Sequence, residues 1–289
     1  MAGVSNETIS PETLAQLRQH IGREERAEDI VTARLVDQYR ATFAPNLAAV
    51  GQGEAPVALH WCLATAAVPT TELKDDGHPQ MGGFLPPVPL PRRMWAGGEM
   101  ETLDTLRLGD RVMRISTVSD VTVKEGKSGL LCFVTLRHEV MTDRGIAIRE
   151  RQDIVYRPEP APDSARRLTR VQQPAADRRW TVEAAPTLLF RYSALTFNSH
   201  RIHYDLPYAT ETEGYSGLVV QGPLQASLLF NLAAVAGGCI PPRFRYAGLA
   251  PLTAGPGFQV NARNSGDGAV ECWTSDIHGQ INMKATATW

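Results

Sequence analysis

One short stretch of the sequence concentrates side chains that can carry out acid–base chemistry. Residues 192–205 read YSALTFNSHRIHYD and place an amide, two imidazoles and a carboxylate within eight residues. An imidazole exchanges protons near neutral pH, so His203 is suited to move a proton to or from carbon. The amide of Asn198 can both donate to and accept from a water molecule, which suits it to hold one. The stretch therefore predicts proton transfer next to a positioned water.

A second feature supplies a candidate for binding negative charge. Gly222 begins the apolar helical stretch GPLQASLLFNLAAVA (222–236). Backbone N–H groups in the first turn of a helix lack intrahelical partners, and the helix dipole favours an anion there. Chemistry on an acyl thioester needs a donor for the charge that develops on the thioester oxygen. Gly222 is the predicted donor, beside a proton carrier at His203 and a water holder at Asn198.

Composition excludes several other classes of protein. The chain has 289 residues and a formal net charge of −2, which argues against a broad basic face for nucleic acid. Its longest apolar stretch, Leu228–Ala236, is far shorter than the roughly 20 residues that span a bilayer. The N-terminus lacks a basic start followed by an apolar run, so we predict a cytoplasmic protein.

The cysteines give no sign of a metal or redox centre. They are Cys62, Cys132, Cys239 and Cys272. No pair has C-x-x-C spacing, so neither a zinc knuckle nor a redox dithiol is indicated. His200 and His203, three residues apart, could share a helical face as metal ligands, but no third ligand follows at suitable spacing. We therefore predict buried thiols in a reducing cytosol, no metal and no cofactor.

The first half of the chain changes from helical to β patterns. Helices are predicted over 11–20, where Ser10 and Pro11 resemble an N-cap and a first-turn proline, and after Thr32. Residues 57–63 predict a strand, and the proline-rich segment 84–98 predicts an extended path. From 99 to 157 long Val-, Ile- and Thr-rich runs separated by turn residues predict an antiparallel meander.

The second half repeats this order of elements. Residues 158–178 lose periodicity and predict a linker near the middle of the chain. An apolar and aromatic segment follows at 187–197, then a strand-like GLVV at 217–220. The helix over 222–236 is apolar nearly all round, which predicts burial. Three strand-like segments close the chain: 243–250, 257–264 and 269–287. A curved sheet wrapped around that helix would bury it.

The motif resembles the signature of the MaoC-like (R)-specific enoyl-thioester hydratases. That signature is an aromatic residue, then Ser/Thr-Gly-Asp-x-Asn-Pro-aliphatic-His-x-Asp. The positions that fit it directly are Thr196, Ile202, His203 and Asp205. The glycine that begins the family's helix after an apolar strand matches Gly222. The phrases FRYSALTFNSHRIHYD and LPRRMWAGG resemble more narrowly the type 2 hydroxyacyl-thioester dehydratases and the itaconyl- or mesaconyl-CoA hydratases, over about residues 25–289.

This resemblance implies an α+β, double hot-dog fold, with two curved antiparallel sheets each wrapped around a helix. It divides the chain into an N-terminal hot-dog domain without the motif (1–157), a linker (158–178) and a C-terminal MaoC-like domain that carries it (179–289). The acyl chain of a CoA thioester is expected in a tunnel beside the helix, with Tyr192 as a wall. Such a chain can stand alone as a pseudo-dimer or pair again as a homodimer, and the sequence leaves both open.

The departures from the signature concern the chemistry. Asn198 stands where the family has an aspartate, and an amide does not accept a proton at neutral pH. Either His203 carries the proton alone while Asn198 orients water, or a carboxylate from the other half contributes. His200 and Arg201 replace the family's Asn-Pro pair. The family role of Asp205 is structural, although a place in substrate binding stays open.

Arginines suggest the class of substrate. Arg191 and Arg201 flank the motif, and Arg92, Arg93 and Trp95 lie in the family-like segment LPRRMWAGG. A guanidinium grips a carboxylate through two parallel hydrogen bonds, whereas a long alkyl tail needs none. Surface packing is the equal alternative for the Arg92–Trp95 run. We therefore expect reversible hydration of a short dicarboxylyl-CoA such as itaconyl-CoA or mesaconyl-C4-CoA, with Arg93, Trp95 and Arg201 binding substrate, as in itaconate degradation.

Three alternative functions remain at this point. A hot-dog thioesterase would aim a carboxylate at the thioester carbonyl carbon or at its attacking water. A 3-hydroxyacyl-carrier-protein dehydratase would use the same residues on a different ester. A non-catalytic acyl-CoA-binding protein is favoured by Asn198 in place of the aspartate and opposed by the retained His203 and Gly222.

Overall fold

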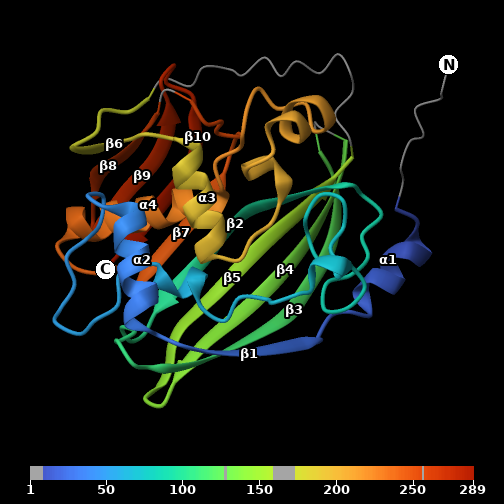
Figure 1. Ribbon diagram of the computed structural model, residues 1–289, viewed down its shortest axis with the longest axis horizontal. Coiled ribbons are helices and arrows are strands. Elements are labelled where there is room, and N and C mark those ends of the chain that lie inside the picture. Colours follow the sequence, from blue (N-terminus) through green and yellow to red (C-terminus); the bar gives the residue numbers. More distant parts are fainter. Residues whose placement is uncertain (1–8, 127–128, 159–172, 256) are drawn as a thin grey trace.

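Antiparallel strands form the frame of the molecule in the computed structural model, which describes residues 9–126, 129–158, 173–255 and 257–289 (Figure 1). The strands of the first half are β1 (Glu24–Ile30), β2 (Arg92–Thr102), β3 (Arg111–Gly126), β4 (Gly129–Thr142) and β5 (Gly145–Arg157). Those of the second half are β6 (Arg178–Val182), β7 (Arg243–Gly248), β8 (Phe258–Gly266), β9 (Ala269–Asp276) and β10 (Ile281–Thr288). They make one sheet in the order β1-β3-β4-β5-β2-β7-β10-β9-β8-β6.

The two halves meet edge to edge in this sheet. Strand β2 pairs with β5 on one side and with β7 on the other, both antiparallel. At the junction Gly97 lies opposite Ala247 and Gly98 opposite Tyr246. A Cβ atom at Gly97 would lie 2.6 Å from the Tyr246 carbonyl oxygen, and one at Gly98 would overlap the Tyr246 hydroxyl. The two glycines therefore permit the close pairing that makes the two predicted sheets continuous.

Helix α4 (Gly222–Gly237) is the buried helix of the second half and lies against β8, β9 and β10 (Figure 1). All its residues from Leu224 to Ala234 are buried, as its apolar composition predicts. Three of these residues are polar, namely Gln225, Ser227 and Asn231, and Asn231 contacts the first half. Its Nδ2 donates to the Val57 carbonyl at 3.2 Å and its Oδ1 accepts from the Ala48 N–H at 3.0 Å. A buried amide thus ties the helix to a loop of the first half.

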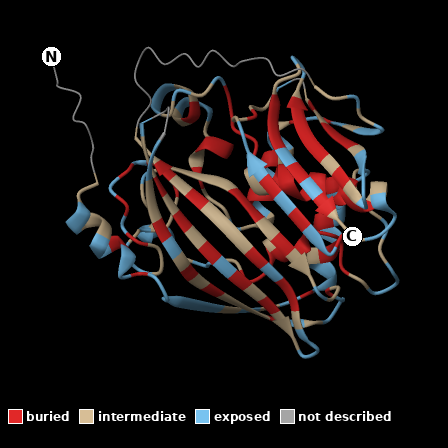
Figure 2. Cartoon of the chain, turned by 180° about the vertical axis from the view of Figure 1, so that it is seen from behind, coloured by how far each residue is buried: buried red, intermediate tan, exposed pale blue. Residues whose placement is uncertain are grey.

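The other helices are shorter and lie around this core. They are α1 (Pro11–Arg18), α2 (Ala33–Phe43) and α3 (Pro186–Leu195), with single turns η1 (Leu59–Cys62), η2 (Thr70–Glu72), η3 (Arg201–His203) and η4 (Tyr208–Thr212). In the first half Leu17 of α1, together with Val88 and Leu90 of the proline-rich segment, packs with buried residues of β3, β4 and β5. Buried residues alternate along β4, as Figure 2 shows from behind. A second, smaller core results.

Several predicted elements differ in detail. The strand predicted over 57–63 is a turn that ends in η1, because Ala58 has a left-handed backbone (φ +68°). The strand-like 217–220 forms only a bridge between Val219 and Thr253. The last predicted strand, 269–287, divides into β9 and β10, because the carboxylate of Asp276 accepts the His278 and Gln280 N–H groups and closes a turn.

The predicted domain boundaries can be compared with only part of the chain. Strand β5 ends at Arg157 and β6 begins at Arg178. Residues 159–172 of the predicted linker lie outside the described residues, so the division at 158–178 stays a prediction. None of the described helices is long and apolar enough to cross a bilayer.

A buried carboxylate stands at the junction of the halves. Glu150 of β5 accepts hydrogen bonds from Trp61 Nε1 at 3.0 Å and from the Tyr246 hydroxyl at 2.7 Å. Burial raises its pKa, and these two donors oppose the rise. Removing a donor from a buried carboxylate leaves its desolvation uncompensated. The Glu150 contacts therefore join β5, β7 and the loop around Trp61.

We expect Tyr246→Phe to lower the free energy of unfolding by about 1–3 kcal/mol, because the ring stays while the buried carboxylate loses a donor. Urea unfolding followed by circular dichroism measures this cost. Tyr204→Phe is the matched control, since Tyr204 is 50% exposed and its change should stay within about 0.5 kcal/mol. Equal stability of Tyr246→Phe and the wild type would contradict a role for this contact at the junction.

Candidate active site

A cavity of about 600 Å³ lies where the two halves meet. Its walls come from β2, β4 and β5 of the first half and from the motif loop, the start of α4 and β10 of the second. The predicted site residues that line it are Arg93, Trp95, Asn198, His203 and Gly222. The proton carrier and the helix-start donor predicted from the sequence thus face the same space.

His203 is held as a neutral base. It is 7% exposed and ends the turn η3. Its Nδ1 lies 2.7 Å from the Val219 carbonyl oxygen, and because a carbonyl only accepts, Nδ1 must carry the proton. Burial lowers the pKa of His203 to about 4, against the effect of the Val219 bond. The ring is therefore uncharged near neutral pH, with Nε2 free to take a proton.

Asn198 is fixed by its own turn. Its backbone N–H donates to the Ser193 carbonyl at 2.8 Å, and its Oδ1 accepts the His200 N–H at 3.1 Å. Phe197, just before it, has a left-handed backbone (φ +50°). Within the described part of the chain the Asn198 Nδ2 has no hydrogen-bond partner, so it is the group available to a bound water or substrate oxygen.

Gly222 allows an aromatic ring to lie against the start of α4. A Cβ atom at this position would come within 2.8 Å of Trp95 Cε3. The Trp95 ring in turn stacks on Tyr246, with ring centroids 4.4 Å apart. Any larger residue at 222 would move either the ring or the helix start, so glycine keeps the backbone N–H close to the cavity wall.

Gln221, which precedes the helix, fastens α4 to α3. Its Nε2 donates to the Leu189 carbonyl and to the Ser193 hydroxyl, both at 2.9 Å. Tyr192 lies behind this contact, 1% exposed, with its ring edge-on to Phe43 at 5.7 Å. It does not line the cavity. The prediction of Tyr192 as a tunnel wall is therefore corrected: it packs between α3 and α2.

Arg201 and Asp205 also lie outside the cavity, in contrast to the predicted role in substrate binding. They pair with each other at 2.7 Å, and the Arg201 guanidinium lies 4.2 Å from the Tyr208 ring centroid. The hydrogen bond with Arg201 lowers the pKa of Asp205. Each charge is compensated by the other, so the pair closes the motif loop and is not available to grip a substrate carboxylate.

Most of the arginines that the sequence pointed to lie outside the cavity. Arg92 is bound by Glu213, with Nε 2.8 Å from Oε2, and Arg191 lies on the exposed side of α3 and donates to the Ala41 carbonyl. Arg93 remains in the cavity wall, joined by Arg157, which the sequence argument did not name. Across the described residues, no carboxylate lies within ion-pair distance of Arg93.

The cavity also holds an imidazole that the sequence argument missed. His78 lines it from the glycine-rich loop of the first half. Its ring centroid is 4.1 Å from that of His200, which in turn is 5.4 Å from that of His203. Only the pattern Asp-Gly-His at 76–78 could have drawn attention to it, and that pattern is common in turns. The described residues contain no group of three His, Cys, Asp or Glu side chains placed to hold a metal ion.

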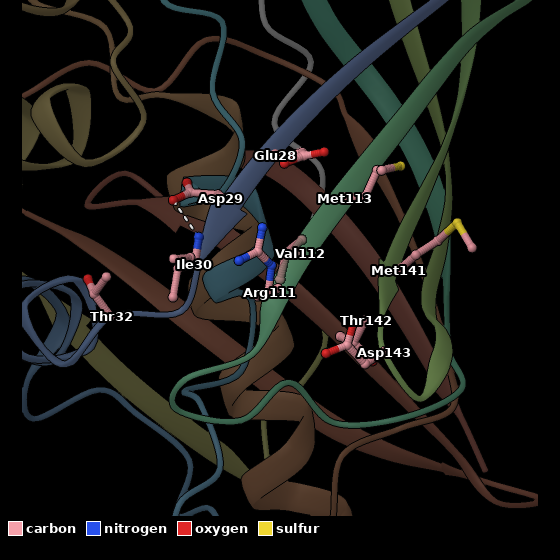
Figure 3. Close-up of a pocket in the computed structure, with 10 residues that line it drawn as sticks. All are labelled: Glu28, Asp29, Ile30, Thr32, Arg111, Val112, Met113, Met141, Thr142 and Asp143. Carbon is pink, nitrogen blue, oxygen red and sulfur yellow. Dashed lines mark hydrogen bonds between the residues drawn. The ribbon is translucent and has the colours of Figure 1, made fainter.

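A second cavity of about 580 Å³ lies at the far edge of the sheet, beside β1, β3 and β4 (Figure 3). Neither histidine nor cysteine is found among the described residues that line it. Three carboxylates line it, those of Glu28, Asp29 and Asp143. Asp29 is already engaged, because Oδ1 accepts the Ile30 N–H and Oδ2 accepts the Ala64 N–H, both at 2.8 Å. The two cavities therefore differ in the side chains that line them and not in their volume.

Comparisons with known proteins agree with this geometry. Residues 58–254 match the family model of the hydroxyacyl-thioester dehydratases of type 2. The chain is 42% identical to the mesaconyl-C(4)-CoA hydratase of Chloroflexus aurantiacus, over 86% of this chain and 89% of that relative.

Solved structures share the fold. A MaoC-like dehydratase from Phytophthora capsici superposes with a TM-score of 0.67 at 15% identity, covering 96% of this chain and 98% of that one. A Mycobacterium tuberculosis protein described as a double hotdog superposes with a TM-score of 0.52 at 12% identity, covering 93% and 96%. The predicted α+β, double hot-dog fold is thereby confirmed.

We expect Gly222→Ala to lower the free energy of unfolding by about 1–2 kcal/mol, because the added methyl group meets the Trp95 ring. Gly83→Ala is the control, since a Cβ there has open space around it. Urea unfolding of the two variants measures the difference. A Gly222→Ala protein as stable as the control would mean that Trp95 does not hold the helix start.

Proposed function

The chain belongs to the family of type 2 hydroxyacyl-thioester dehydratases, and we propose that it hydrates a short dicarboxylyl-CoA thioester such as mesaconyl-C4-CoA or itaconyl-CoA. Membership in the family makes the chain a hydro-lyase that acts on acyl thioesters. The observation that carries the finer proposal is one cavity that holds a neutral His203 and an Arg93 that no carboxylate of the described residues pairs with.

The proposed reaction adds water across C2 and C3 of the acyl group. The Asn198 Nδ2 and the His203 Nε2 hold the water, and its oxygen attacks C3 while Nε2 takes one of its protons. The electron pair of the double bond moves toward C2 and the thioester oxygen, where the Gly222 N–H stabilises the enolate. A proton delivered to C2 completes the hydration, and dehydration follows the same path in reverse.

The second carboxylate of the substrate explains the cationic part of the cavity. Arg93 shares the cavity with apolar walls that include Trp95, Phe133 and Ile154. A guanidinium near apolar walls binds a carboxylate strongly, because water competes less there. A saturated or monounsaturated alkyl chain would leave Arg93 without a partner. The name of the relative from Chloroflexus aurantiacus supports the same choice.

We further propose that the protein works in the cytoplasm with a CoA ester and no protein-bound cofactor. All four cysteines are free thiols, three of them buried, which suits a reducing compartment. Formation of a homodimer and the preference for CoA over a carrier protein stay predictions.

His203→Ala should lower kcat by about 10²–10⁴-fold, because the variant lacks the base that takes the proton from water. Loss of enoyl-thioester absorbance with mesaconyl-C4-CoA, itaconyl-CoA and crotonyl-CoA, assayed side by side, measures it. His278→Ala should behave as the wild type, because His278 is exposed and does not line the cavity. Near-native kcat in His203→Ala, or a clear preference of the wild type for crotonyl-CoA, would count against the proposal. Release of free CoA from a saturated acyl-CoA would indicate a thioesterase.

Arg93→Gln should raise KM for mesaconyl-C4-CoA by about 10–100-fold, the equivalent of one charged hydrogen-bonded contact. The KM for crotonyl-CoA, which lacks a second carboxylate, should change little. Arg191→Gln is the matched control, because Arg191 lies outside the cavity on an exposed helix face. A parallel rise in KM for both esters would assign Arg93 to the CoA moiety and not to the acyl carboxylate.

A further inference from the structure

The hydration proposed above needs a group that delivers a proton to C2. His200, the other imidazole of the motif, also lines the cavity, but burial lowers its pKa to about 2, so it holds no proton to deliver. Asn198 replaces the family aspartate and cannot give up a proton at neutral pH. The Asp205 carboxylate is paired with Arg201 outside the cavity. We propose that His78, held by Asp76, is this second proton-transfer residue, so that the first half of the chain supplies the acid and the second half supplies the base. The inference rests on the proposed hydratase function.

The first observation is the geometry of His78 and Asp76. His78 lines the cavity together with His203. Its Nδ1 lies 3.3 Å from Asp76 Oδ2, and its backbone N–H donates to Asp76 Oδ1 at 2.8 Å. One carboxylate therefore fixes the main chain at His78 by a hydrogen bond and lies within ion-pair distance of the ring Nδ1. The Nε2 of His78 is left for chemistry, an arrangement in which a carboxylate orients a catalytic imidazole.

The second observation is the tight docking of this loop on the motif. Ser199 Oγ donates to the Gly77 carbonyl at 2.6 Å, and the Arg201 N–H donates to the Asp76 carbonyl at 2.9 Å. Arg201 Nη1 also donates to the Asp75 carbonyl at 3.0 Å. Gly77 has φ +87°, and a Cβ there would overlap the Ser199 carbonyl oxygen. The residues that depart from the family signature around 198–201 thus receive the loop that brings His78.

The surroundings of the two imidazoles assign their roles. Burial lowers the pKa of both, but only His78 has a carboxylate that opposes the change. The pKa of Asp76, which burial alone would raise, is held below its ordinary value by His78 and Lys74. A pair of titratable groups whose environments separate their pKa values gives one acid and one base. His78 is accordingly the acid of the hydration direction and His203 the base.

The charged groups around His78 set the pH at which it titrates. Asp76 favours its protonated form, whereas Lys74 on the same loop and Arg93 on β2 disfavour it. The ring of His200 lies against it, with His203 next in the motif loop. Burial lowers the pKa of both, and the charge of His78 lowers it further. A substrate carboxylate bound at Arg93 would cancel part of the positive field and so favour the imidazolium.

The proton balance of the step is complete. As the water oxygen bonds to C3, an O–H bond breaks and its proton goes to His203 Nε2. The double-bond electrons form the enolate, and the Nε2–H bond of the His78 imidazolium breaks as C2 takes that proton. His203 then releases its proton to solvent and His78 takes one up. In dehydration neutral His78 removes the C2 proton, and protonated His203 gives its proton to the hydroxide that leaves C3.

This assignment predicts a bell-shaped pH profile of kcat/KM. Activity falls at low pH as His203 becomes protonated, and falls at higher pH as His78 loses its proton. Asp76→Asn keeps the size of the side chain and an oxygen for the His78 N–H but removes the charge. We expect it to shift the falling alkaline limb to lower pH and to reduce kcat about tenfold or more, with little change in KM. His78→Asn should abolish that limb and reduce kcat about 10²-fold.

The test compares wild type, Asp76→Asn, His78→Asn and the control His278→Asn with mesaconyl-C4-CoA from about pH 4.5 to 9. The control should reproduce the wild-type profile, because His278 lies on an exposed turn. Wild-type profiles in both Asp76→Asn and His78→Asn would overturn the role of His78 and leave the hydratase function standing. Wild-type protein without hydratase activity would overturn the function itself. If His78→Asn does not fold, the position of the alkaline limb in the pH profile of Asp76→Asn decides whether His78 is the acid.

Discussion

Close pairing of β2 with β7 is the contact on which the rest of the structure depends. It requires Gly97 and Gly98, because any side chain there would collide with the neighbouring strand. The pairing places Trp95 on Tyr246 and against Gly222, and it buries the Glu150 carboxylate beneath them. A cavity with walls from both halves exists because two sheet edges meet at this line.

Burial then gives the cavity its chemistry. Imidazoles at 78, 200 and 203 all lose basicity because the surrounding protein disfavours their charge. What distinguishes them is the second atom that each ring contacts: a backbone carbonyl for His203 and a carboxylate for His78. Burial thus keeps His203 neutral and able to take a proton, whereas the contact with Asp76 favours the protonated form of His78.

The sequence predicted the parts of the site that are local and periodic. His203, Asn198 and Gly222 lie on one loop and one helix start, whose residue types and spacing indicate their positions. It failed where a contact depends on distant chain segments. The docking of His78 follows from the way a glycine-rich loop of the first half crosses to the motif loop, and such loops have no hydrophobic period to read. Likewise, residues 57–63 read as a strand, but the polar contacts of Trp61 and the turn at Ala58 form only in the folded molecule.

Because both halves line the cavity, the concentration of a bound ligand affects the stability of the interface between them. A ligand whose atoms touch both halves binds the assembled molecule and neither half by itself, so occupancy adds RT ln(1 + [L]/Kd) to the free energy that keeps the interface closed. At a concentration one hundred times Kd this is about 2.7 kcal/mol, comparable to several buried hydrogen bonds. Such a ligand holds the two halves together, so the resistance of the chain to proteolysis rises and falls with the ligand's concentration.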